Sequence, residues 1–75
     1  MNEVEIRSEP VELYKILKFE GLVSSGGEAK MVIDSGAVMV NGEIETRKRR
    51  KIVAGDSIEF MSEQYSIVLG ADNKE

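Results

Sequence analysis

The chain has 75 residues, with ten lysines and arginines, fourteen aspartates and glutamates, and a formal net charge of −4 at pH 7. A chain of this length has room for one domain with a thin core. It contains no cysteine and no histidine, which removes disulfides, thiolates, the commonest metal ligand and the usual catalytic base. We therefore expect no metal, no cofactor and no enzymatic activity.

The N-terminal residues are acidic, with Glu3 and Glu5, and no long apolar run follows them. A secretory signal has a basic start and then an apolar stretch, so we expect none here. The apolar runs fall far short of the roughly 20 residues that cross a bilayer, and we expect a cytoplasmic protein with no membrane partner. Residues 1–70 are expected to form one domain, and residues 71–75 a polar C-terminal tail.

The N-terminal part of the chain predicts a short strand followed by a helix. Residues 1–7 alternate between apolar and charged side chains, as a strand does. Ser8 or Glu9 is placed to cap the helix, and Pro10 stands in its first turn, where proline is tolerated. Apolar residues then recur at helical spacing at Leu13, Ile16 and Leu17. Gly21 is placed to end this helix in a left-handed conformation.

A second helix is expected from Ser25. Ser25 and Glu28 have the spacing of a capping box, in which each side chain bonds the other residue's backbone amide. Its apolar stripe consists of Ala29, Val32 and Ile33. Gly36 then ends the helix. Because the link between the helices is short, the two should form a corner like a helix–turn–helix.

From residue 36 onward the apolar period changes to two, which predicts strands. Asn41-Gly42 is a strong hairpin signal, and Gly55-Asp56 marks another turn. The expected strands and turn after the second helix are residues 38–40, 43–45, 57–60 and 65–69, with a turn at 62–64. We therefore predict an α+β domain in which two short helices pack on a small, mostly antiparallel sheet.

Five consecutive cations interrupt this strand region: Arg47, Lys48, Arg49, Arg50 and Lys51. They hold half of the positive charge, so the rest of the chain carries five cations against fourteen anions, or −9. Such a run must lie at the surface, and a local positive patch is the electrostatic footprint of nucleic-acid binding. Two other interpretations are a solvated loop that offsets Glu43, Glu45 and Glu59, and a nuclear-import signal.

The start of the second helix is a further candidate for a phosphate contact. Its free amides and its dipole favour an anion, and Gly26 and Gly27 allow a close approach after Ser25. Lys30 follows in the second turn. On the first helix, Lys15 and Lys18 lie off the apolar stripe and belong to the site only if the fold brings them beside Lys30 and the basic run. The acidic residues form no convincing catalytic or metal-binding constellation.

The order of these signals resembles the alpha-L RNA-binding motif, the domain named after ribosomal small-subunit protein S-four. The resemblance covers roughly residues 10–60 and is carried by Leu13, Leu17, Gly21-Leu22, Ser25, Ala29-Lys30, Ile33, Gly36, Val38, Val40-Asn41-Gly42, Gly55-Asp56 and Ile58. Residues 25–30 together with 45–49 resemble a narrower group, the small stand-alone bacterial members that consist of little more than this domain.

The resemblance implies binding to structured RNA, often ribosomal RNA. In the family, the second helix and the loop that leads into the later strands line the RNA surface. Carried over to this chain, the contacts fall on Ser25, Gly26, Gly27, Lys30 and the five cations of residues 47–51. One departure is that many members have an arginine after the serine that begins the second helix, where this chain has Gly26.

We therefore expect a monomeric module that docks on structured, ribosomal RNA and serves ribosome assembly or translation, with ribosomal proteins as further candidate partners. Phe19, Phe60 and Tyr65 are expected in or beside the core, which leaves Tyr14 as the aromatic candidate for base stacking. The alternative function is a protein-interaction adaptor whose basic loop binds an acidic partner.

Overall fold

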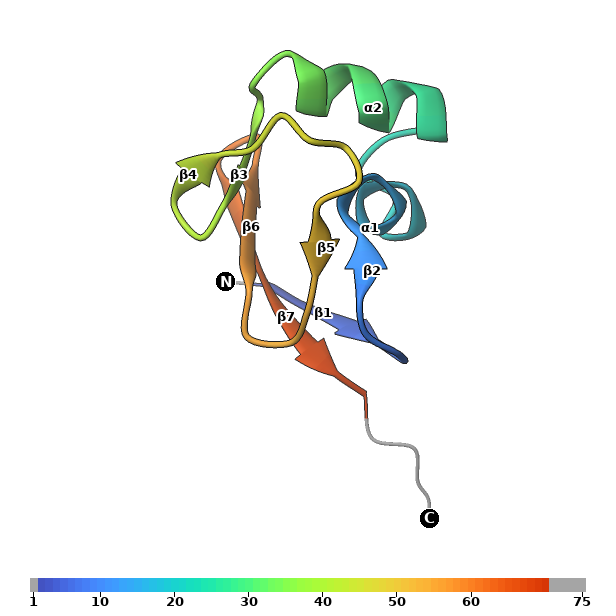
Figure 1. Cartoon of the computed structure of the whole chain (residues 1–75), viewed down its shortest axis with the longest axis vertical. Helices are drawn as coiled ribbons and strands as arrows, with labels where there is room; N and C mark the ends of the chain where they lie inside the picture. The colour runs from blue at the N-terminus through green and yellow to red at the C-terminus, as the bar shows by residue number, and fades with distance from the viewer. Residues whose placement is uncertain (1, 71–75) are drawn as a thin grey trace.

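The computed structural model describes residues 2–70, which form two helices and seven strands (Figure 1). In chain order these are β1 Asn2–Ile6, β2 Val11–Glu12, α1 Leu13–Phe19, α2 Gly26–Asp34, β3 Val38–Val40, β4 Glu43–Ile44, β5 Lys51–Ile52, β6 Ser57–Phe60 and β7 Glu63–Leu69. The main sheet has the order β1-β7-β6-β3-β4, and β2 pairs with β5 separately. Only β1 and β7 run parallel in these pairings; the others are antiparallel. The predicted α+β class is confirmed.

One continuous core joins the helices to the sheet. The predicted helical stripes are buried except for Val32, which is half-buried at the edge of the core. They meet the inward side chains of β1, β3, β6 and β7 and of the small β2–β5 pair. The buried apolar residues are Val4, Ile6, Leu13, Ile16, Leu17, Val23, Ala29, Ile33, Val38, Val40, Ile52, Ile58, Phe60 and Ile67. Removing these side chains from water is the main favourable term for a domain of this size.

The first helix starts later than the sequence predicted. Residues Val11–Glu12 are a strand paired with β5, and α1 begins at Leu13. Pro10 lies outside the helix, and the Glu9–Pro10 peptide bond is cis. The carboxylate of Glu9 accepts a hydrogen bond from the Ala54 amide at 2.7 Å. The predicted cap at Ser8 or Glu9 is therefore wrong, because strand pairing, which depends on a distant segment, takes the residues before Leu13.

The second helix begins as predicted, with one change in its cap. The Ser25 side chain accepts a hydrogen bond from the Glu28 amide at 3.1 Å. The Glu28 carboxylate does not return to Ser25; it accepts from the amide and the hydroxyl of Ser24, both at 2.7 Å. Gly36, with φ +85°, follows the helix as expected.

Two expectations about apolar residues and turns are also corrected. Phe19 is 70% exposed and does not belong to the core, because a helical step of about 100° per residue places it about 120° from the centre of the buried stripe. The last hairpin turns at Met61 and Ser62, both with positive φ, so the turn precedes Glu63, the first residue of β7. Phe60 is buried and Tyr65 packs at the edge of the core, as predicted.

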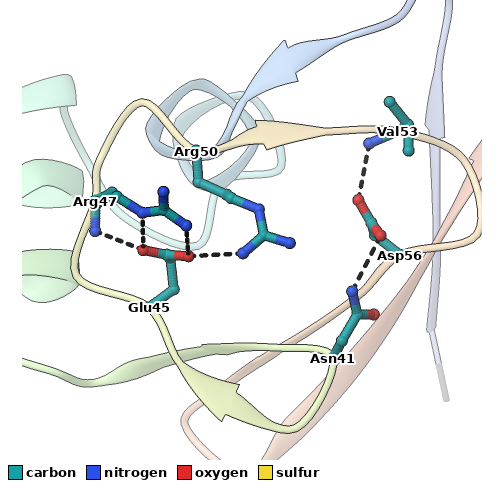
Figure 2. Close-up of polar contacts among 6 residues, drawn as sticks. All are labelled: Asn41, Glu45, Arg47, Arg50, Val53 and Asp56. Carbon is teal, nitrogen blue, oxygen red and sulfur yellow. Dashed lines mark hydrogen bonds and ion pairs between the residues drawn. The ribbon is translucent and has the colours of Figure 1, made fainter.

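The two turns that the sequence marked are bonded to each other. Asn41 has φ 53° in the β3–β4 hairpin, and its side-chain oxygen accepts from the Ser57 amide at 2.9 Å. Its side-chain nitrogen donates to Asp56 at 3.1 Å, and the other Asp56 oxygen accepts from the Val53 amide at 3.0 Å (Figure 2). This network fixes the turn before β6 against the β3–β4 hairpin.

No helix within residues 2–70 is long and apolar enough to cross a bilayer. The polar tail predicted for residues 71–75 lies outside the described residues.

Replacing Asp56 with alanine should lower the free energy of unfolding by about 1–3 kcal/mol, because the Val53 amide and the Asn41 side chain each lose their acceptor. Urea denaturation measures this loss. Asp34→Ala is the matched control, since Asp34 is exposed at the end of α2, and it should change stability by less than about 0.5 kcal/mol. Equal effects of the two substitutions would contradict the role given to the network.

Candidate nucleic-acid interface

The five cations form a turn followed by the first residue of β5, and we call residues 47–51 the basic loop. The Arg50 amide donates to the Arg47 carbonyl at 3.1 Å, which closes the turn around Lys48 and Arg49. Lys51 enters β5 opposite Glu12. The chain therefore does not adopt the extended form in which alternate cations would project to opposite sides.

A buried carboxylate holds the turn from within. Glu45 accepts from the backbone amide of Arg47 at 2.9 Å and from its Nε and Nη2 at 3.0 and 3.1 Å. Arg50 Nη1 donates to the same carboxylate at 2.7 Å. Figure 2 shows the carboxylate between the two guanidinium groups. Both arginines therefore point to the same acceptor although they are three positions apart in the chain.

Glu45 stays ionised under all ordinary conditions. The side-chain hydrogen bonds from Arg47 lower the pKa of Glu45 to about 2, with help from the Arg47 amide and from Arg50, and against the opposing effect of burial. Hydrogen bonding to Glu45 and its charge in turn raise the pKa of Arg47. Glu45 is only 7% exposed, and a buried charge is tolerated when it is paired and hydrogen-bonded in this way.

The backbone of the basic loop also caps the first helix. The amides of Leu13 and Tyr14 donate to the carbonyls of Arg50 and Lys48, at 2.9 and 3.1 Å. The first amides of a helix lack partners within it, and no side chain bonds them from the N-cap residue, Glu12. Because the carbonyls point toward α1, the loop is attached to the domain through its backbone.

We call the bonds from Arg47 and Arg50 to the Glu45 carboxylate the clamp. Three cations of the loop have exposed side chains that take no part in it: Lys48, Arg49 and Lys51. An open concavity of about 640 Å³ is lined by residues 46–51 alone. Its wall is thus the loop itself, with a cation at every position after Thr46. Its charge suits a phosphate group, which planar arginines bind in a bidentate manner and lysines bind as point charges.

Lys30 contacts Tyr14, a residue that also bonds the basic loop. Its ammonium nitrogen is 4.9 Å from the centre of the Tyr14 ring, a cation–π contact between the two helices. Since the Tyr14 amide is bonded to the Lys48 carbonyl, α2 and the loop meet at this tyrosine. Lys30 and the loop therefore contact the same residue, one at its ring and the other at its backbone amide, and one face of the ring that was expected to stack on bases carries Lys30.

The start of α2 leaves open space at its glycines. A Cβ added at Gly26 would meet nothing within 4 Å, and one added at Gly27 would approach only the Ser25 hydroxyl, at 3.8 Å. Neither glycine has a positive φ, so the fold itself does not require glycine here. Hydrogen bonds from the amide and side chain of Ser24 lower the pKa of Glu28 and turn its carboxylate toward that residue.

The two lysines of the first helix are placed differently from the other residues predicted to bind RNA. Lys15 is 3.6 Å from the Glu12 carboxylate, and Glu12 pairs with Lys51 across the β2–β5 strands. Lys18 lies in the last turn of α1, whereas the loop caps the first. Lys15 is therefore ion-paired with a residue whose backbone neighbours Lys51, and Lys18 is at the far end of the helix from the loop.

The sequence did not single out Glu45 as a buried residue. It appeared there as one of three acids, with Glu43 and Glu59, that a solvated basic loop would offset. In the structure β4 ends at Ile44, and Glu45 turns inward while Glu43 stays exposed. No group of three acidic residues within the described part of the chain is placed to hold a metal ion.

Comparison with known proteins identifies this arrangement. Residues 4–68 match the S4 domain family. In Escherichia coli (strain K12), "Putative RNA-binding protein YbcJ" is 48% identical over 58 residues, which cover 77% of this chain and 83% of that protein. The solution structure of YbcJ, described as revealing an alpha-L motif involved in RNA-binding, superposes with a TM-score of 0.69 at 42% identity, over 91% of this chain and 87% of that one.

Two further relatives show where the domain occurs. "Probable ribosome maturation protein RlbA" of Bacillus subtilis (strain 168) is 36% identical over 59 residues, or 79% of this chain and 83% of that protein. A tyrosine–tRNA ligase of Bordetella pertussis is 38% identical over 55 residues, which are 73% of this chain but 13% of the ligase. The domain is thus a small part of that enzyme and most of the other two proteins.

The fold and the match together define a class: the chain belongs to the S4 domain family. Its two helices on a mostly antiparallel sheet are the alpha-L motif that the sequence resembled.

The carboxyl carbon of Glu45 should titrate with a midpoint near pH 2 in a ¹³C NMR experiment, against 4.5 for an ordinary glutamate. Because the pKa is depressed in the folded state, the ion pairs stabilise the fold fully above about pH 4.5, and this stabilisation is lost as the pH falls toward 2. A midpoint near 4.5 would contradict the clamp.

Proposed function

We propose that this protein is an RNA-binding module that docks on structured RNA through the basic loop and the start of α2. The observation that carries the proposal is the fixed presentation of the loop. Lys48, Arg49 and Lys51 have exposed side chains. The loop that carries them is held by its carbonyls, which accept hydrogen bonds from α1, and by the ion pairs of its arginines with Glu45. Lys30 contacts the ring of Tyr14, whose amide bonds the same loop. The basic loop stands out on a chain whose residues outside 47–51 carry −9.

Binding on this proposal is mainly electrostatic. Neutralising phosphates releases the counterions condensed on RNA, and the loop and Lys30 supply the cations. The first amides of α2 add hydrogen bonds to a phosphate that approaches Gly26 and Gly27, where the backbone is free of side chains. Aromatic stacking contributes little, since the chain has two tyrosines and two phenylalanines, and Phe60 and Tyr65 belong to the core or its edge.

We further propose structured ribosomal RNA as the target and ribosome assembly or translation as the process. The support is the Bacillus subtilis relative, whose name refers to ribosome maturation. On this proposal the chain acts by binding, as a cytoplasmic monomer, and not by catalysis. Ribosomal proteins that lie next to the bound RNA are the expected neighbours.

The affinity for ribosomal RNA should fall steeply with salt. If four or five phosphates are neutralised, log K against log[salt] has a slope of about −3 to −4, and replacing Lys48 or Arg49 with alanine should make it shallower by about 1 each. Filter binding or fluorescence anisotropy over a salt series measures this. Asp34→Ala is the control away from the loop. A slope shallower than about −1 for the unaltered protein would contradict the electrostatic account.

Gly26→Ala should separate RNA binding from stability. The added methyl group fits the folded chain, and alanine favours a helix over glycine by up to about 1 kcal/mol, so the melting temperature should be unchanged or raised. The same methyl group obstructs a phosphate, and losing a charge-assisted hydrogen bond should weaken binding roughly tenfold. Ser35→Ala, at the other end of α2, serves as the control. Unchanged affinity in Gly26→Ala would place the phosphate elsewhere.

Capture of partners from lysate, with and without ribonuclease, distinguishes RNA binding from the protein-adaptor alternative. On the RNA proposal, co-purifying proteins disappear when the RNA is digested completely. Partners that survive the digestion would support an acidic protein as the ligand of the basic loop.

A further inference from the structure

The unexpected feature of the interface is an acid inside it. We infer that Glu45 is the positioning residue of the RNA-binding loop: its buried carboxylate fixes Arg47 and Arg50 so that the cations between them are presented in one arrangement. The inference rests on the proposed function, which it deepens by dividing the five cations into two that bond Glu45, of which Arg47 keeps a 73% exposed side chain, and three that make no bond to Glu45.

The Glu45 carboxylate bonds both ends of the turn. Glu45 bonds one residue at each end of the turn, through three donors of Arg47 and one of Arg50. Its own amide donates to the Val38 carbonyl at 2.9 Å, which ties it to strand β3, the neighbour of β4 in the sheet. The clamp is therefore anchored to the sheet, and it fixes the loop relative to the core.

The charge of the loop explains why such a clamp is needed. Five adjacent cations repel one another and favour a spread, mobile chain. Glu45 pairs with two of them, and its 7% exposure keeps water from competing. The side chains of Lys48 and Arg49, at the tip of the turn, are then left pointing outward from a fixed backbone. A loop that is already ordered loses less conformational entropy when it binds.

Simple electrostatics and positioning make opposite predictions for Glu45→Gln. The substitution removes a negative charge beside an RNA site and frees two arginines, so charge alone predicts tighter binding. Positioning predicts weaker binding to folded RNA, because the neutral amide cannot hold two guanidinium groups and the loop must be ordered by the RNA itself. Glu43→Gln is the matched control: it makes the same charge change two residues away, at an exposed side chain.

The test compares two probes, transcribed small-subunit ribosomal RNA as the folded polymer and poly(U) as the flexible one. Glu45→Gln should bind the ribosomal RNA about tenfold more weakly, the effect of ordering two long side chains on binding, and bind poly(U) at least as tightly as the unaltered protein. Glu43→Gln should bind both probes equally well or more tightly. If Glu45→Gln matches Glu43→Gln on ribosomal RNA, or loses affinity equally for both probes, the inference is overturned.

Two conservative substitutions test whether a change of charge, without loss of positioning, explains the effect of Glu45→Gln. Arg47→Lys and Arg50→Lys keep the charge of the loop but lose the planar fork that fits a carboxylate. The double variant should behave like Glu45→Gln: it should bind ribosomal RNA about tenfold more weakly than the unaltered protein and bind poly(U) at least as tightly. A double variant that binds both probes like the unaltered protein would overturn the inference. Amide spectra of residues 2–6 and 57–69, whose backbone hydrogen bonds do not involve the basic loop, should stay unchanged in every variant, which shows that the core is folded.

Loop order can be measured without RNA, so that failure of the proposed function and failure of this inference remain distinguishable. If the unaltered protein does not bind ribosomal RNA, the proposed function fails. NMR relaxation of amides 46–50 then decides on the clamp: fast motion that appears in Glu45→Gln but not in Glu43→Gln supports it. Unchanged order in Glu45→Gln overturns it.

Discussion

The carboxylate of Glu45 is the charge around which the basic loop is arranged. A buried anion is unfavourable unless cations and hydrogen-bond donors surround it, and breaking such a pair is more costly than the pair is worth. Four donors from two arginines meet this requirement. The same contacts determine the shape of the turn that carries Lys48 and Arg49, so that one internal constraint fixes the outward-facing cations.

The loop also completes the fold of the helices. Its carbonyls accept hydrogen bonds from the first amides of α1, and Lys51 and Ile52 pair with the strand that leads into that helix. In Figure 1 the chain between β4 and β5 passes beside α1 on its way to β5. Because Tyr14 contacts both the loop backbone and Lys30, the position of α2 is coupled to the loop as well.

Local patterns predicted most of the elements. The stripe of Leu13, Ile16 and Leu17 and that of Ala29 and Ile33 are buried as expected, because helical spacing alone decides which residues share a face. The Asn41-Gly42 hairpin also forms as predicted, since positive φ at both residues suits asparagine and glycine. One error lies where distant segments pair: Val11–Glu12 became a strand because β5 is there to bond it. The errors at Phe19 and at the turn of Met61 and Ser62 are local ones.

The sequence by itself determined the class of fold, the buried faces, and the presence of one concentrated patch of cations in an acidic chain. It could do so because apolar periodicity, turn chemistry and charge are properties of neighbouring residues. Only the tertiary structure decided which of those cations are held and which are presented. That division depends on Glu45 turning into the protein and on the loop backbone meeting α1, contacts between segments that the chain brings together only when it folds.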